Sequence, residues 1–179
     1  RLRRWKNSSP SGISTQHLHP PRQIRLIRHG CAEPSRFGQT DHARPLNQRG
    51  LDDLRNTTHQ LLTRKENNAD WLWASSAART LTTAQALSST CSCSMQLEED
   101  LYLAGPESIL SVLQSTPEDF RNVILVGHNP GISMLAGLLN NPAQTIELDT
   151  LGIVELTFTG QWQDLSFCQC RFQATYDYK

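Results

Sequence analysis

The sequence predicts an α/β fold, a three-layer sandwich in which helices cover both faces of a mostly parallel central sheet. From residue 23 onward, short apolar runs alternate with amphipathic stretches. The apolar runs have the length of buried strands, and the amphipathic stretches repeat their leucines at helical spacing. This alternation is typical of parallel strands joined by crossover helices.

The first strand and the first helix are predicted within residues 23–65. Residues 24–27 (Ile-Arg-Leu-Ile) predict a short, mostly buried strand that ends at residues 28–30 (Arg-His-Gly). A polar loop follows, and Asn47 is a good N-cap for a helix that runs to about Lys65. The leucines expected at helical spacing are Leu51, Leu54, Leu61 and Leu62.

Two further helices and one strand are predicted in the middle of the chain. Residues 71–74 form a second short apolar run, and Ser75-Ser76 is expected to cap the following helix. The inner face expected for that helix contains Leu81, Ala84 and Leu87. Residues 107–114 predict another helix because they follow Pro106.

The last third of the chain contains the clearest strand. Residues 123–126 (Val-Ile-Leu-Val) predict a fully buried strand, after which Asn129 can cap a helix with Pro130 at its first position. The side chains that this helix should bury are Ile132, Leu135, Leu138 and Leu139. Residues 153–158 and 165–172 predict later strands, the second at a sheet edge.

The length of 179 residues fits one domain, which we expect to cover residues 23–179. Residues 1–22 contain Arg, Ser, Pro and His but no acid, and their few apolar residues have no regular period. This segment predicts a flexible tail. Its composition also resembles an organellar transit peptide, and since the first residue is not Met, an artefactual start is equally open.

Charge and composition exclude several classes of function. Seventeen Lys and Arg balance seventeen Asp and Glu, which is unlike a nucleic-acid-binding protein. No window approaches the roughly 20 apolar residues that span a bilayer, and no dinucleotide or Walker loop indicates a nucleotide cofactor. Five cysteines, an odd number, favour a reducing compartment, so we expect a cytoplasmic protein. Four of them form two Cys-x-Cys pairs, Cys91 with Cys93 and Cys168 with Cys170. Zinc sites usually have two to four residues between paired cysteines, so no metal is expected.

Four side chains are predicted to form an anion site. Arg28 and His29 follow the first strand, Arg79 lies at the start of a helix, and His128 follows the clearest strand. Ligands of α/β sheets bind at the carboxyl ends of strands, and helix N-termini favour anions. The pattern therefore predicts a phosphate site, at which Gly30 and Gly127 would let the backbone turn sharply and approach the ligand.

These residues also carry a family resemblance. Residues 26–30 (Leu-Ile-Arg-His-Gly), residues 75–84 with Arg79, and residues 126–131 (Val-Gly-His-Asn-Pro-Gly) resemble, in order and spacing, the three motifs of the histidine phosphatase superfamily, which includes the cofactor-dependent phosphoglycerate mutases. Arg44-Pro45-Leu46, Leu101-Tyr102 and the short chain are similar to SixA-type phosphohistidine phosphatases. The resemblance implies a phosphoglycerate mutase-like fold and a phosphatase that needs no metal or other cofactor.

The resemblance also implies a covalent mechanism. His29 would be the nucleophile and would carry the phosphoryl group as phosphohistidine, with the carbonyl of Gly30 orienting its ring. A neutral imidazole is a competent nucleophile because its reference pKa is about 6.5. Arg28 and Arg79 would bind phosphoryl oxygens in bidentate fashion. His128 would hydrogen-bond the transferring group before water hydrolyses the intermediate.

Further residues are expected at the edge of the site. Arg44 is a candidate third clamp, although it could equally cap a helix or pair with Asp52 or Asp53. Gly30 and Asn129 are candidate substrate-binding residues because they belong to the matched motifs. The sequence assigns no general acid, and the candidates are Asp41, Glu99 and Asp100. Because imidazole is a good leaving group, a phosphohistidine substrate hardly needs such an acid.

The sequence leaves the substrate open. The resemblance favours a phosphorylated protein, such as a histidine phosphotransfer domain, and the long loop of residues 31–46 is the expected docking segment. A small-molecule phosphomonoesterase or mutase-like enzyme that acts on a small phosphate ester is the first alternative. A catalytically idle phosphoprotein-binding module is the second.

Overall fold

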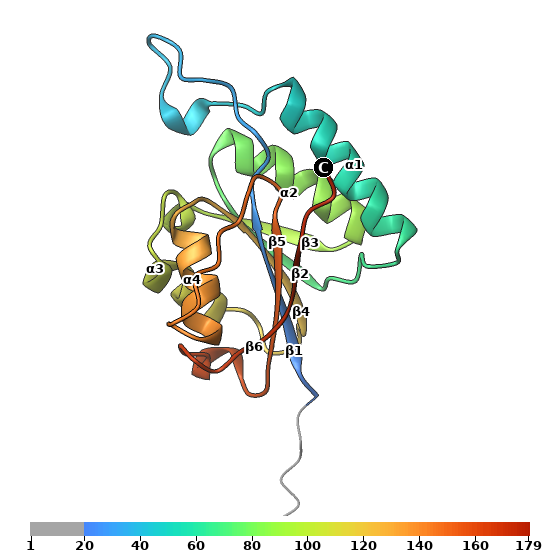
Figure 1. The fold of residues 1–179 in the computed structure, drawn as a ribbon, viewed down its shortest axis with the longest axis vertical. Coiled ribbons are helices and arrows are strands. Elements are labelled where there is room, and N and C mark those ends of the chain that lie inside the picture. The colour runs from blue at the N-terminus through green and yellow to red at the C-terminus, as the bar shows by residue number, and fades with distance from the viewer. Residues whose placement is uncertain (1–19) are drawn as a thin grey trace, which may run out of the picture.

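The structure, a computed structural model, describes residues 20–179 and has a central sheet between two layers of helices (Figure 1). The strands are β1 (Arg22–Arg28), β2 (Trp71–Ser75), β3 (Ser94–Glu98), β4 (Asn122–Gly127), β5 (Ile153–Phe158) and β6 (Arg171–Tyr176). The α-helices are α1 (Gln48–Thr63), α2 (Ala78–Cys91), α3 (Pro106–Gln114) and α4 (Gly131–Asn140). Three short 3-10 helices are η1 (Asp41–Ala43), η2 (Glu99–Leu101) and η3 (Trp162–Asp164). The predicted fold class is confirmed.

The sheet brings the ends of three strands together. Its order is β3-β2-β4-β1-β5-β6, with β1 to β4 parallel and β5 antiparallel to both of its neighbours. Arg28 of β1 aligns with Gly127 of β4, and Ala74 of β2 aligns with Val126 of β4. The residues that follow β1, β2 and β4 therefore meet at one edge of the sheet.

Two apolar clusters hold the helices on the sheet. Leu26 and Leu125 pack with α3 and α4, whereas Ile27 and Ile124 point to the opposite face and pack with α1 and α2. Successive residues of a strand point to opposite faces, so the central strands β1 and β4 are buried on both sides. Burial of each such side chain stabilises the fold by about 1.5–3 kcal/mol.

The fold begins slightly earlier than the sequence predicts. Arg22 is the first residue of β1, and its guanidinium donates hydrogen bonds to the Glu118 carboxylate at 2.6 Å and to the Phe120 carbonyl at 2.7 Å. The predicted boundary was wrong at this residue. Arg22 resembles the basic tail in sequence, but it is buried because acceptors in the fold pair with its guanidinium. The prediction of a tail over residues 1–19 lies outside the described residues.

Both edges of the sheet differ from the prediction. β3 was not expected, because only Met95 and Leu97 alternate in an otherwise polar segment that is half-exposed at the edge. The last predicted strand is displaced, since β6 begins only at Arg171. The residues before it turn back, and the N–H groups of Cys168 and Cys170 donate to carbonyls at the end of α4.

The buried faces of three helices differ in detail from the prediction. Leu51 and Leu62 of α1 are exposed, and Leu81 of α2 and Leu138 of α4 are only half-buried. The buried positions of α1 are Gly50, Leu54, Thr57 and Leu61. Leu54 and Leu61 are buried as predicted, and a glycine and a threonine occupy the other two inner positions instead of Leu51 and Leu62.

Two helix starts also differ from the prediction. Ser75 ends β2, Ser76 does not cap α2, and that helix has no side-chain cap. Pro130 precedes α4 instead of filling its first position. The Asn129 side chain accepts a hydrogen bond from the Ser133 hydroxyl at 2.6 Å rather than from a backbone amide.

None of the described helices combines the length and the apolar character needed to cross a membrane.

Candidate active site

The predicted anion-binding residues gather at the carboxyl edge of the sheet. His29 follows β1, His128 follows β4, and Arg79 lies in the first turn of α2. The three residues are 8%, 2% and 2% exposed, respectively. The imidazole rings of His29 and His128 lie edge to face with their centroids 5.1 Å apart. The structure therefore brings together groups that are far apart in the chain.

His29 is held as a neutral imidazole with a defined tautomer. Its Nδ1 lies 2.7 Å from the Gly30 carbonyl oxygen, which can only accept, so Nδ1 carries the proton. Its Nε2 accepts from the Arg79 Nε at 3.2 Å. The His29 pKa is lowered to about 4, mainly by burial and in part by the charges of Arg79 and Arg28, against the opposing effect of the Gly30 carbonyl. The lone pair of Nε2 is therefore available near neutral pH.

Arg79 contacts this lone pair directly, and Arg28 lies near enough for its charge to lower the His29 pKa. Arg79 donates from one terminal nitrogen to the Asp41 backbone carbonyl at 2.8 Å and from the other to the Asp41 carboxylate at 3.0 Å. Arg28 donates to the Leu148 carbonyl at 3.1 Å, and its buried Nε has no partner among the described residues. Such an unused donor is suited to an anion that enters the site.

Arg44 reaches the same cluster through Asp41. Its guanidinium contacts the Asp41 carboxylate at 2.7 Å and donates to the Glu33 carbonyl at 3.0 Å. The alternative pairing with Asp52 or Asp53 is wrong, since those acids pair with Arg55 and Arg49 instead.

Of the three candidate acids, Asp41 alone lies in this cluster, and its environment keeps it ionised. Its carboxylate accepts a hydrogen bond from the Tyr102 hydroxyl at 2.6 Å, in addition to those from Arg79 and Arg44. The Tyr102 hydrogen bond is the largest cause that holds the Asp41 pKa well below its usual range, and the arginines act in the same direction. Asp41 therefore has no proton to donate near neutral pH, which disfavours it as a general acid.

The other two candidate acids lie further out. Glu99 is exposed and accepts from the Ser76 hydroxyl at 2.8 Å, and Ser76 in turn contacts the His42 Nε2 at 2.9 Å. Asp100 is exposed and lines a separate shallow hollow beside α3 together with Ser108. Neither carboxylate contacts His29, Arg79 or His128 in the described structure.

The two predicted substrate-binding residues have structural partners. The Gly30 amide donates to the Thr83 hydroxyl at 3.2 Å, and its φ is not in the left-handed region. The expectation of a sharp glycine turn at Gly30 is wrong; a Cβ there would instead lie 3.1 Å from a methyl group of Leu46. Asn129 donates to the Leu148 carbonyl at 2.8 Å, so its amide ties the start of α4 to the segment that also holds Arg28.

Two residues of the site had no predicted role. Ser75, expected only as a helix cap, contacts the His128 Nε2 at 2.7 Å. Tyr102 packs edge to face against His128, with ring centroids 5.6 Å apart, and binds Asp41. The sequence could have predicted a site role for Ser75, because it ends a buried strand at the sheet edge where the other site residues were expected.

Burial lowers the His128 pKa to about 3, so this ring is also neutral.

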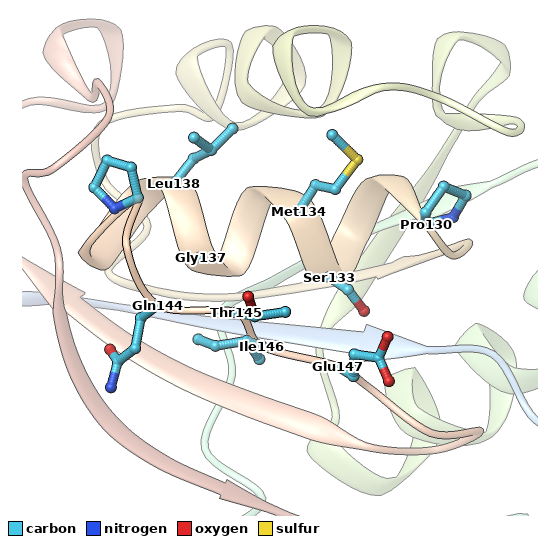
Figure 2. A pocket seen from close by; sticks show the side chains of 10 residues that line it. Pro130, Ser133, Met134, Gly137, Leu138, Gln144, Thr145, Ile146 and Glu147 are labelled. Atoms are coloured by element: carbon cyan, nitrogen blue, oxygen red, sulfur yellow. The ribbon is translucent and has the colours of Figure 1, made fainter.

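A hollow lies beside this cluster, between α4 and residues 142–147 (Figure 2). Ser133 and Glu147 lie near one end of it in this view, and Leu138 and Gln144 lie nearer the other. The Ser133 hydroxyl accepts from the Leu148 amide at 3.0 Å, so one wall of the hollow is continuous with the segment that holds Arg28 and Asn129.

The comparisons with known proteins bear on the family and the fold. The sequence model of the histidine phosphatase superfamily (branch 1) matches residues 24–102, which contain Arg28, His29 and Arg79. His128 lies beyond the matched segment, and the sheet brings it to the other three residues.

Several solved structures have the same fold. A Nakamurella multipartitia protein assigned as the phosphohistidine phosphatase SixA has a TM-score of 0.76 and 26% identity, over 90% of this chain and 98% of that chain. A protein of the same assignment from Agrobacterium tumefaciens has a TM-score of 0.73 and 24% identity, over 88% and 99%. The mycobacterial glucosyl-3-phosphoglycerate phosphatase has a TM-score of 0.64 and 14% identity, over 87% and 98%.

One curated sequence also matches. An uncharacterized protein of Mycobacterium leprae is 32% identical over 75 residues, which is 37% of this chain and 47% of that relative. The match thus spans about half the length of the relative. The matched segment and the fold define the class of protein that this chain is similar to, namely the histidine phosphatase superfamily.

Proposed function

We propose that the protein is a phosphatase, which hydrolyses protein phosphohistidine through a covalent phosphohistidine on His29. The observation that carries the proposal is the state of the His29 ring, which is neutral, holds its proton on Nδ1 and presents the Nε2 lone pair beside Arg79. An imidazole in this state can attack phosphorus without first losing a proton.

The reaction has two displacements. In the first, the His29 Nε2 forms a bond to phosphorus while the P–N bond of the substrate breaks, and the departing imidazole takes a proton from solvent. In the second, water attacks the phosphorus and releases inorganic phosphate and neutral His29. Arg28 and Arg79 bind the phosphoryl oxygens, Arg44 is the third clamp, and His128 hydrogen-bonds the transferring group as charge redistributes.

The absence of a poised acid in the described site supports the choice of substrate. The carboxylate nearest to the nucleophile, that of Asp41, is held ionised by Tyr102 and the arginines. A phosphate ester needs a proton on its alkoxide leaving group, whereas an imidazole leaves readily because its pKa is about 6.5. The similarity to proteins assigned as SixA supports the same substrate class.

Phosphate release by the EDTA-treated protein tests this proposal. The substrates are a phosphorylated histidine phosphotransfer domain, an aryl phosphate and glucosyl-3-phosphoglycerate, in parallel. We expect the phosphoprotein to be hydrolysed with the highest kcat/KM and His29→Ala to be inactive on all three substrates. A preference for either ester would contradict the proposed substrate and favour a small-molecule phosphatase. Binding of the phosphoprotein without phosphate release would indicate an idle binding module.

The loop of residues 31–46 is the proposed docking segment for the protein substrate. It extends beyond the sheet in Figure 1, it holds Asp41 and Arg44 at the site, and its Phe37 is fully exposed. A Phe37→Ser variant should raise KM for the phosphoprotein and leave turnover of the aryl phosphate unchanged. The exposed Leu62 of α1 offers a matched control, since Leu62→Ser should change neither. Equal effects of Phe37→Ser on both substrates would contradict this docking role.

A further inference from the structure

Ser75 contributes a hydroxyl at the end of β2 that has no access to solvent. The residue is 0% exposed, and its Oγ lies 2.7 Å from the His128 Nε2. The backbone N–H of Ala77 points to the same oxygen at 3.5 Å. The hydroxyl oxygen therefore accepts one weak hydrogen bond, and the hydroxyl hydrogen needs an acceptor.

The placement of this hydrogen fixes the proton of His128. A buried hydroxyl that donates to nothing costs about 1–3 kcal/mol, and in the described structure the acceptor that Ser75 reaches is the His128 Nε2. If Nε2 carried the ring proton, the Ser75 oxygen would accept from it, and two buried groups would lack a partner: the Ser75 hydrogen and the Nδ1 lone pair. With the proton on Nδ1, only the Nδ1–H lacks a partner. The Ser75 hydroxyl therefore donates to Nε2, and the single proton of the neutral ring lies on Nδ1.

The Nδ1 of His128 is buried and has no hydrogen-bond partner among the described residues. It belongs to the ring that packs on the nucleophile, with centroids 5.1 Å apart. A buried N–H without an acceptor is costly in the resting protein, and such a donor is found where charge develops during a reaction.

We propose that Ser75 is a positioning residue, which holds the proton of His128 on Nδ1 so that this N–H is ready to donate to the transferring phosphoryl group. The inference rests on the proposed phosphatase mechanism and deepens it. The two nitrogens of the His128 ring then have different roles. Nε2 accepts from Ser75, which orients the ring, and Nδ1–H donates to the phosphoryl group. This arrangement also gives a role to the buried serine at the end of β2, which does not cap α2.

The tautomer can be read directly in the resting protein. Long-range proton–nitrogen correlation spectra of protein labelled with nitrogen-15 histidine distinguish a protonated from an unprotonated ring nitrogen, and the His128 signals are assigned by their loss in His128→Asn. We expect a protonated Nδ1 and an unprotonated Nε2 at pH 7, with Nδ1 shifting when inorganic phosphate is added. A proton on Nε2 in the wild type would overturn the proposal.

Kinetics of Ser75 variants provide the second readout. Removal of one transition-state donor costs about 10²–10³ in kcat, so Ser75→Ala, which frees the tautomer but keeps the ring, should lower kcat by roughly 10- to 100-fold with little change in KM. Ser75→Thr keeps the hydroxyl and should restore most of the loss. Ser88→Ala removes a half-buried hydroxyl near the far end of α2 and is the matched control.

The two measurements separate the inference from the function on which it rests. If Ser75→Ala retains the Nδ1 tautomer and full kcat, Ser75 is not the positioning residue, whichever substrate is hydrolysed. A protein that hydrolyses esters in preference to phosphohistidine would contradict the proposed substrate, whereas the spectrum of the resting protein would still decide the role of Ser75.

Discussion

At the scale of single residues, burial and hydrogen bonding act in opposite directions on the nucleophile. Burial and two arginine charges disfavour protonation of His29, while the Gly30 carbonyl favours it. Burial dominates, so the pKa falls to about 4 and the ring is neutral at pH 7. The sequence predicts that His29 and Arg79 share a site, but the assignment of the free nitrogen needs the structure.

Arg79 is the arginine whose geometry is least replaceable. Its Nε faces His29 while both terminal nitrogens face Asp41, which uses the planar fork of the guanidinium. Arg79→Lys keeps the charge but loses the fork, so we expect kcat/KM to fall by about 100-fold or more. Steady-state hydrolysis of the phosphoprotein measures this, with the exposed Arg55→Lys as the control. Wild-type kinetics for Arg79→Lys would show that charge alone suffices.

At the scale of elements, η1 places the Asp41 carboxylate against the guanidinium groups of Arg79 and Arg44. Asp41 occupies donors of Arg79 and Arg44 while Tyr102, which follows η2, holds it from the other side. A phosphoryl group needs donors of the same arginines. The sequence could not predict this arrangement, because Asp41 and Tyr102 are 61 residues apart and no pattern links them.

Removal of the Asp41 charge should strengthen phosphate binding. Asp41→Asn preserves the shape of the side chain and frees the arginines from an anion, so inorganic phosphate should inhibit about 3- to 10-fold more tightly. Inhibition constants at constant ionic strength measure the effect. Weaker inhibition by phosphate would instead mean that the main contribution of Asp41 is to hold Arg79 in place. Asp100→Asn, a change at an exposed position outside the cluster, should leave the inhibition constant unaltered.

The elements predicted well are those with enough apolar residues to set a period. Residues 123–126 are apolar throughout and lie in the centre of the sheet as β4, and Asn47 caps α1 as expected. β3 was not predicted, because a half-exposed edge strand of five residues has too few apolar side chains to show an alternating pattern. The displaced start of β6 depends on hydrogen bonds to the end of α4, which are tertiary contacts.

At the scale of the whole molecule, the site makes stability depend on pH. His29 and His128 have folded pKa values of about 4 and about 3, below the reference of about 6.5 for an unfolded chain. Between these values the unfolded state binds more protons than the folded state, so stability falls as pH falls. The lowered pKa of Asp41 acts in the same direction at still lower pH.

Denaturation in urea at pH 7 and pH 5 tests this dependence. Each buried imidazole should contribute about 1–2 kcal/mol to the loss of unfolding free energy between the two values. His128→Asn should therefore reduce the difference between pH 7 and pH 5, and His59→Asn, at an exposed position of α1, should not. An unchanged pH dependence in His128→Asn would mean that this ring titrates normally in the folded protein.

The covalent role of His29 can be examined by trapping the phosphorylated intermediate. The protein is mixed with a radiolabelled phosphohistidine protein, quenched in alkali within milliseconds and digested, and the labelled peptide is identified by mass spectrometry. Alkali-stable, acid-labile label on His29 in the wild type, with none in His29→Asn, is the predicted result. Label on another residue, or full turnover by His29→Asn, would contradict the mechanism.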